Sequence, residues 1–155
     1  VDISREFGDH QPVMIFSVHP TPAFPAVNYA EVPMRSRFQT LWAVVGAYAN
    51  CPTPKQNPYR TLATMPASER FAFNSIVEDF VRNRPTLLFV QTNFGLWRCD
   101  DRPFDFIAYF RGHPQFERAF RHYKPLMEAH ELTVYYRGPA DLELRARAGE
   151  LASAE

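Results

Sequence analysis

Apolar positions along the chain form short continuous runs and helical stripes, separated by proline-containing breaks. The segments 11–18 and 86–91 are nearly continuous apolar runs, which are typical of buried strands. Between them, the segment 67–83 begins after Pro66 and stops at Arg84-Pro85, and it carries an apolar stripe that predicts a helix: Phe73, Ile76, Val77, Phe80 and Val81. Helix, proline and apolar strand in this order indicate an α/β layer with a crossover helix.

Weaker patterns predict the remaining elements. The segment 38–49 has helical spacing at Leu41, Trp42, Val44, Val45 and Tyr48. Two short helices are expected, one capped by Asp105 and running to Phe110, and one over 114–122. The alternating segment 131–137 reads as a strand that pairs with 124–129 as a hairpin.

These elements predict one small α/β domain over 1–137. We expect a Rossmann-like layered fold with a mostly parallel sheet flanked by helices and a C-terminal β-hairpin. The tail, 138–155, is rich in Ala, Glu and Arg and lacks a strong apolar stripe. It is expected to be either a frayed, solvated helix or a disordered segment.

Composition excludes several classes of protein. A chain of 155 residues that is 46% hydrophobic is long and apolar enough for one packed core. Its 17 basic residues balance its 17 acidic ones, so no overall field favours nucleic acid as a partner. The longest apolar run, 41–49, is too short to span a bilayer, so we expect a soluble domain. The start at Val1, without a signal-peptide pattern, suggests a fragment of a longer protein or a processed product.

Candidate ligand-binding residues lie mainly in the loops that follow the predicted strands, because parallel α/β sheets bind ligands beyond the carboxyl ends of their strands. Arg37, in a basic pair with Arg35, is a further candidate for holding an anionic group. Each candidate also has a purely structural interpretation as a loop-capping or solvated side chain. The loop candidates are His19, Asn28, Asn93, Trp97, Asp100 and Asp101.

Recognisable catalytic and cofactor-binding motifs do not appear in the sequence, so we expect no cofactor and no metal site. The pair Asp100-Asp101 resembles a turn more than a cation site, since Arg98 and Arg102 flank it.

The two tryptophans are candidates for binding a sugar, because a flat indole face can stack on a sugar ring. Trp97, in a polar loop, is the better candidate for stacking on a sugar, whereas Trp42 is expected in the core.

Cys51 and Cys99 are the two cysteines, and they allow either one disulfide or two free thiols. The sequence pattern alone does not choose between these states. An oxidising compartment would favour the bridge.

Several segments resemble the soluble C-terminal portion of bacterial multi-pass membrane glycosyltransferases of the GT-C type. The resemblance rests on Pro-Ala-Phe-Pro-Ala-Val-Asn-Tyr-Ala (22–30), Arg-Phe-Gln-Thr-Leu-Trp (37–42), the helix-proline-strand unit that ends near Gln91, and the stretch 123–137. It implies a domain on the periplasmic face of the bacterial inner membrane, joined to the membrane through upstream segments that this chain does not contain. It also makes a Cys51–Cys99 bridge more plausible, since the periplasm is oxidising.

The resemblance places no catalytic residue in this chain. It implies an accessory domain that shapes or recognises a glycan or lipid-linked sugar acceptor. A second hypothesis is a small self-contained enzyme or binding protein for a sugar or phosphorylated ligand, in which His19 would act with Asp100 or Asp101 within hydrogen-bond reach. A third is a structural domain that binds other proteins through an exposed apolar patch.

Overall fold

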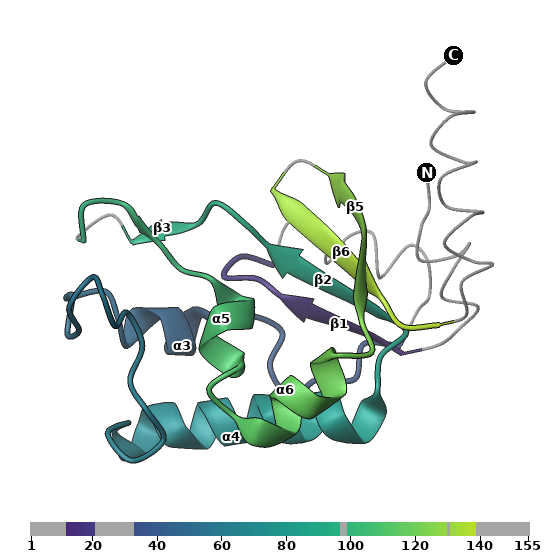
Figure 1. Cartoon of the computed structure of the whole chain (residues 1–155), viewed down its shortest axis with the longest axis horizontal. Coiled ribbons are helices and arrows are strands. Elements are labelled where there is room, and N and C mark those ends of the chain that lie inside the picture. Colours follow the sequence, from purple (N-terminus) through teal and green to yellow (C-terminus); the bar gives the residue numbers. More distant parts are fainter. Residues whose placement is uncertain (1–11, 21–32, 97–98, 130, 139–155) are drawn as a thin grey trace.

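The computed structural model describes residues 12–20, 33–96, 99–129 and 131–138 (Figure 1). Within these residues the main sheet has the strand order β1 (Val13–Phe16), β2 (Leu87–Gln91), β6 (Leu132–Tyr136) and β5 (Lys124–Ala129). The fold is therefore mixed α/β, with a four-stranded sheet and helices. A second, two-stranded sheet joins β3 (Gly95–Leu96) to β4 (Arg102–Pro103).

The four-stranded sheet is mixed, whereas the sequence predicted a mostly parallel one. Only the β1–β2 pairing is parallel among the described strands, and β2–β6 and β5–β6 are antiparallel. The predicted C-terminal hairpin is confirmed as β5 and β6. Its second strand pairs directly with β2, so two of the three pairings in this sheet are antiparallel. The segment 33–35 lies along the free edge of β1, where the Val13 amide donates to the Pro33 carbonyl at 3.1 Å.

The described helices pack against one face of the sheet (Figure 1). They are α3 (Trp42–Gly46), α4 (Ala67–Asn83), α5 (Phe106–Phe110) and α6 (Pro114–Phe120). Side chains alternate along a strand, so Met14 and Phe16 face the helices while Val13 and Ile15 face the opposite way. The strands β1 and β2 are therefore buried on both faces, as their continuous apolar runs predicted.

Phe16 of β1 is fully buried, and its ring contacts aromatic rings from the helices that cover the sheet. Its ring lies 4.8 to 6.3 Å, between centroids, from rings on α4, α5 and α6: Phe80, Phe106, Phe110 and Phe116. Aromatic pairs at this separation add stability beyond the burial of their apolar surface. These contacts fix the helices relative to the end of β1.

The helix α4 matches its sequence pattern closely. It begins after Pro66, and its apolar stripe packs on the core, with every stripe residue buried except Val81, which is half-buried. It ends at Arg84, which adopts a left-handed conformation (φ 44°) and precedes Pro85. The predicted helix over 38–49 is reduced to the five residues of α3 in the structure.

Trp42 is 56% exposed, contrary to the prediction that it packs in the core. Leu41, Val44, Val45 and Tyr48 have the spacing i, i+3, i+4 and i+7, and all four are buried. Trp42 is offset from that stripe by one residue, about 100° around a helix. The indole therefore points away from the buried face.

A buried carboxylate organises the polar groups inside the core. The Glu69 side chain is 1% exposed and accepts hydrogen bonds from the hydroxyls of Tyr48 (2.7 Å) and Tyr109 (3.1 Å). Arg60 completes the cluster, with Nη1 2.6 Å from Glu69 Oε2. Buried charges are tolerated when they are paired and hydrogen-bonded in this way. The cluster ties α4 to the segment after α3 and to α5.

Candidate functional site

The carboxyl ends of β1 and β2 are held together by the side chain of Gln91. Its Oε1 accepts from the Val18 amide at 3.0 Å and from Ser17 Oγ at 3.0 Å. Both Gln91 and Ser17 are buried. The amide side chain of Gln91 therefore has a structural role, since it fixes the point where the chain leaves the sheet.

A hollow of about 270 Å³ lies directly beyond β2, where the sequence placed candidate ligand residues. We call it the strand-end hollow. Its polar side chains come from Gln91, Thr92, Asn93 and Asp105, and its apolar walls include Pro103, Phe104, Phe106, Ile107 and Tyr135. Burial raises the pKa of Tyr135, and the nearby Asp105 carboxylate adds to this effect. The Tyr135 hydroxyl is thus a neutral hydrogen-bonding group near a carboxylate.

Two of the polar groups in the strand-end hollow are exposed to solvent. Asn93 has a left-handed backbone (φ 62°), a conformation that asparagine tolerates better than most residues. Asp105 caps α5 through Oδ1, which accepts from the Ala108 amide at 2.9 Å. Asn93 was predicted from the sequence as a ligand residue, whereas Asp105 was predicted as a helix cap and not as part of a ligand site. Asn93 follows the strand β2, and Asp105 caps the helix α5 that comes after the next loop. This order of strand, loop and capped helix is the sequence feature that could have indicated both residues.

A second hollow, of about 490 Å³, adjoins the first and shares Pro103 and Asp105 with it. It contains the candidates Asp100 and Asp101 together with Lys55, Tyr59 and Arg102. Asp100 and Asp101 both have left-handed backbones, with φ of 54° and 51°. Such conformations cost free energy and concentrate at tight turns and functional sites.

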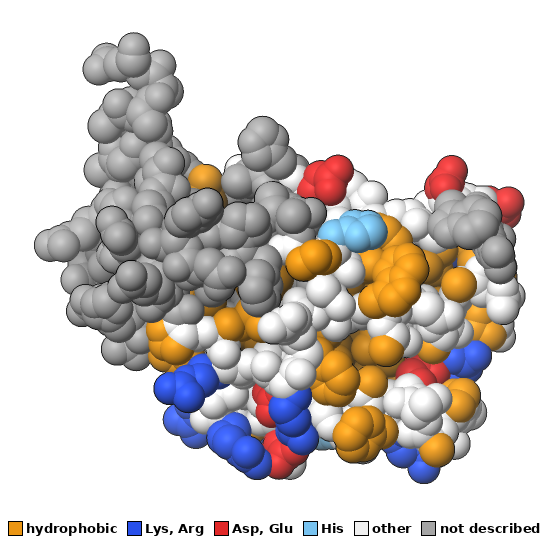
Figure 2. All heavy atoms as spheres, turned by 180° about the vertical axis from the view of Figure 1, so that it is seen from behind, with side chains coloured by type: hydrophobic (Ala, Val, Ile, Leu, Met, Phe, Trp, Pro, Cys, Tyr) orange, Lys and Arg blue, Asp and Glu red, His pale blue; other side chains and the backbone are white. Residues whose placement is uncertain are grey.

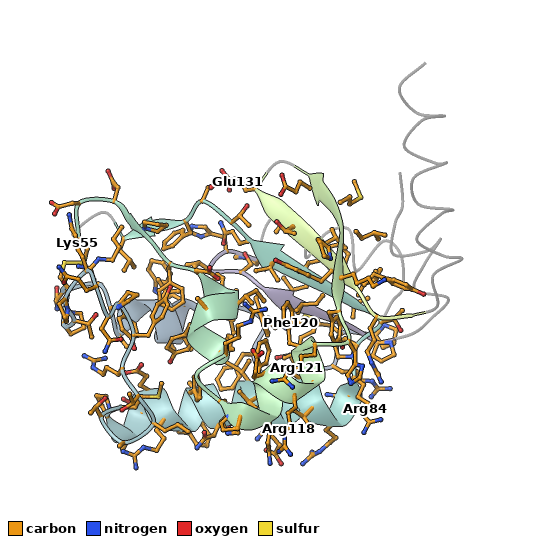
Figure 3. The ribbon with its side chains drawn as sticks, viewed as in Figure 1. Lys55, Arg84, Arg118, Phe120, Arg121 and Glu131 are labelled. Carbon is orange, nitrogen blue, oxygen red and sulfur yellow. A yellow bond between two sulfur atoms is a disulfide. The ribbon has the colours of Figure 1, made fainter. Side chains whose placement is uncertain are left out.

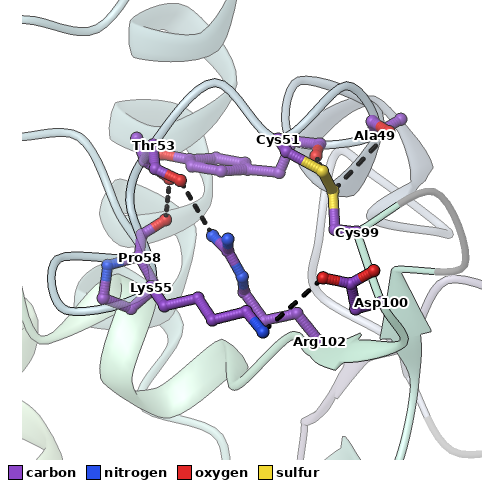
Figure 4. Close-up of a disulfide and its surroundings, with 9 residues drawn as sticks. Ala49, Cys51, Thr53, Lys55, Pro58, Cys99, Asp100 and Arg102 are labelled. Carbon is purple, nitrogen blue, oxygen red and sulfur yellow. Dashed lines mark hydrogen bonds and ion pairs between the residues drawn. A yellow bond between two sulfur atoms is a disulfide. The ribbon is translucent and has the colours of Figure 1, made fainter.

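A disulfide between Cys51 and Cys99 closes this end of the molecule (Figure 4). Cys51 lies in the loop after α3, and Cys99 precedes β4, 48 residues later. Two further contacts join the same loops. Lys55 Nζ lies 3.5 Å from Asp100 Oδ2, and Arg102 Nη1 donates to the Thr53 carbonyl at 3.0 Å. The Lys55–Asp100 pair is exposed and contributes little stability, so the disulfide is the main link.

His19 is exposed at the end of β1, and its described ring neighbours are aromatic. Its centroid lies 6.0 Å from those of Trp42 and Phe94. Asp100, its proposed catalytic partner, is paired with Lys55 instead. Among the described residues, no hydrogen bond links His19 to Asp100 or Asp101.

Arg37 lies away from the strand-end hollow and has partners within the chain. Its Nε donates to Asp79 Oδ1 at 2.9 Å, and Nη2 donates to Glu78 Oε2 at 2.5 Å. These hydrogen bonds, first to Asp79 and then to Glu78, raise the pKa of the guanidinium. The rear view in Figure 2 shows basic and acidic side chains side by side near the C-terminal part of α4. Asn28 and Trp97 lie outside the described residues.

No family model, curated protein or solved structure matches the chain. Within residues 12–20, 33–96, 99–129 and 131–138, no group of three His, Cys, Asp or Glu side chains is placed to hold a metal ion. No helix in the same residues is both long and apolar enough to cross a membrane.

Proposed function

We propose that this chain is an accessory extracytoplasmic domain of a membrane glycosyltransferase-like protein. In this proposal the domain recognises or shapes a glycan or lipid-linked sugar acceptor and has no catalytic centre of its own. It lies on the periplasmic face of a bacterial inner membrane as part of a longer protein. The β1–α4–β2 crossover is the part of the fold that supports a Rossmann-like relationship.

The observation that carries the proposal is the composition of the strand-end hollow. A sugar presents hydroxyl groups around its rim and C–H groups on its ring faces. Asn93 and Asp105 supply amide and carboxylate groups that donate to or accept from hydroxyls. Pro103 and Tyr135 supply apolar surface. Small-molecule sites commonly combine an apolar wall with a few polar groups in this way.

The disulfide supports the extracytoplasmic part of the proposal. Disulfides persist in oxidising compartments such as the bacterial periplasm and are rare in the cytosol. The bridge between Cys51 and Cys99 stands beside the second hollow, whose lining includes the neighbouring residue Asp100. The loops around the second hollow, which adjoins the proposed glycan site, are thus held by a bond suited to that compartment.

Glycan binding is tested by titrating the isotope-labelled chain with neutral oligosaccharides and following backbone amide signals. We expect saturable shifts in residues 91–93 and 103–107. Asn93→Gly removes the amide side chain while tolerating the left-handed backbone, so it should weaken binding without unfolding the loop. Asn57→Gly, at another exposed loop position outside the hollow, serves as the matched control. Shifts elsewhere in the protein, or equal effects of both variants, would contradict the glycan site.

The location is tested with the complete natural gene product in bacterial cells. Protease added to spheroplasts should digest this domain while leaving cytoplasmic proteins intact. A domain that resists protease until the inner membrane is lysed would rule out the extracytoplasmic part of the proposal.

A further inference from the structure

A basic hollow of about 340 Å³ lies where the end of α4, the helix α6 and the end of β6 meet. Its charged rim comprises Arg84, Arg118 and Arg137, and His122 and Gln115 add polar groups. Its floor is apolar: Phe80, Val81, Ala119 and Tyr123. None of the described lining residues is acidic. Figure 3 shows Arg84 and Arg118 along the lower side of the molecule, one at the end of α4 and the other on α6.

The three arginines of this hollow have no carboxylate partner in the part of the chain that the structure describes. The contrast with other arginines is clear. Within the described ranges, the arginines that form ion pairs with Asp or Glu are Arg37, Arg60, Arg82, Arg111 and Arg121. Arginine is always charged at physiological pH, so three guanidinium groups without a carboxylate partner among the described residues repel one another around this concavity. An anion in the hollow relieves that repulsion.

The backbone holds these charges together. The Arg137 amide donates to the carbonyl of Thr86 at 3.0 Å, and Thr86 follows Arg84 by two residues. Arg137 therefore lies close to the turn between α4 and β2. The guanidinium groups of Arg84 and Arg137 both affect the pKa of the Tyr123 hydroxyl. Burial raises the pKa of Tyr123, while the positive charges of Arg137 and Arg84 oppose that rise. The Tyr123 hydroxyl itself is occupied, since it donates to the Pro85 carbonyl at 2.6 Å.

The ligand class follows from this arrangement. A phosphate monoester carries a charge of about −1.5 to −2 and three acceptor oxygens, which match several guanidinium donors better than a single carboxylate does. The apolar floor offers contact to the organic group attached to the phosphate. A volume near 340 Å³ lies within the range of small-molecule sites.

We propose that this hollow binds the phosphate group of a phosphomonoester, whose apolar part rests on the floor formed by α4 and α6. The site is separate from the strand-end hollow. Arg84 precedes the first residue of β2, whereas Gln91 is its last, so the two sites lie at opposite ends of that strand. The phosphate site therefore does not depend on the proposed glycan function.

The test is calorimetric titration of the 155-residue chain with phenyl phosphate, inorganic phosphate and benzyl alcohol. We expect phenyl phosphate to bind saturably, inorganic phosphate to bind more weakly, and benzyl alcohol not to bind. Arg118→Gln and Arg137→Gln should each weaken phenyl phosphate binding at least about tenfold, which is about 1.4 kcal/mol. Arg121→Gln is the matched control, because Arg121 carries the same charge but pairs with Glu117 and does not line the hollow. It should change the affinity less than about twofold.

Vesicles distinguish the two sources of such a phosphate. Sedimentation with phosphatidic acid vesicles, lost in Arg118→Gln but not in Arg121→Gln, would assign the site to a lipid headgroup. Binding to phenyl phosphate without vesicle binding would assign it to a free phosphorylated molecule. Equal losses in Arg121→Gln and the pocket variants, or no saturable binding of phenyl phosphate at millimolar concentration, would overturn the proposal.

Discussion

Opening the Cys51–Cys99 disulfide is expected to lower the free energy of unfolding by about 4 kcal/mol. The bridge closes a segment of 48 residues. Loop-closure entropy for that length is about −14 cal/mol/K, or about 4 kcal/mol at 25 °C. A domain of this size has a total stability of about 5 to 15 kcal/mol. The bridge thus accounts for a large part of the margin between folded and unfolded protein.

Urea unfolding, followed by tryptophan fluorescence, measures this effect in the oxidised chain, the reduced chain and Cys51→Ser. With a slope of about 2 kcal/mol/M, the midpoint should fall by about 2 M. Cys51 is the better position to change because it is exposed, whereas Cys99 is buried with Sγ 3.4 Å from the Tyr48 carbonyl oxygen. Losses below about 1 kcal/mol in both the reduced chain and Cys51→Ser would refute the entropic reasoning.

Three further measurements test the core and the helix end. Glu69→Gln removes the charge that balances Arg60, so the free energy of unfolding should fall by about 3 kcal/mol in urea, and a loss under about 1 kcal/mol would contradict the cluster. Arg84→Gly relieves a left-handed non-glycine residue (φ 44°), so calorimetry should show a melting temperature about 1 to 2 °C higher; a decrease would show that Arg84 is not strained. Burial raises the pKa of Tyr59 to about 12 and raises that of Tyr109 as well. The stability that depends on their protonated hydroxyls is complete below about pH 10 and is lost as the pH rises through the folded-state pKa values. Alkaline unfolding, monitored by tyrosinate absorbance, should therefore begin near pH 10 and shift upward in Tyr109→Phe; an unchanged transition would contradict this.

The elements with the strongest local signals were predictable from the sequence. The helix α4 is marked at both ends by proline, and its stripe repeats every three or four residues. The strands β1 and β2 are continuous apolar runs, and the structure confirms both. Asp105 was predicted as a cap, and its side chain does accept from the Ala108 amide. In each case the sequence signal that predicts the element lies within a few consecutive residues.

The arrangement of the sheet was not predictable in the same way. The apolar run of β2 shows that both of its faces are buried, but it does not show which strand lies beside it. The hairpin provides that neighbour, with β6 antiparallel to β2 from Leu87↔Tyr136 to Gln91↔Leu132. Continuous apolar strands led us to expect parallel neighbours. A buried antiparallel partner gives the same sequence pattern.

Part of the candidate chemistry was also visible in the sequence, and part was not. Asn93 follows a strand and lies in the strand-end hollow, as the rule for strand ends suggests. Glu69 is indistinguishable from an exposed residue of the first helical turn until Tyr48 and Tyr109 are placed around it. Its partners lie 21 and 40 residues away. No local pattern encodes such a cluster.

The basic hollow shows that a chain with no net charge can still carry a local cluster of positive charge. On a helix, opposite charges three or four residues apart neutralise each other, as Arg121 and Glu117 do. Arg118 has no acidic residue at those spacings: its neighbours are Pro114, Gln115, Arg121 and His122. The sequence alone therefore shows that Arg118 has no ion-pair partner on its own helix. The sequence does not show that Arg137 lies close to Arg84, because this proximity depends on the pairing of β6 with β2. That pairing adds further positive charge beside Arg118 and so creates the proposed anion site.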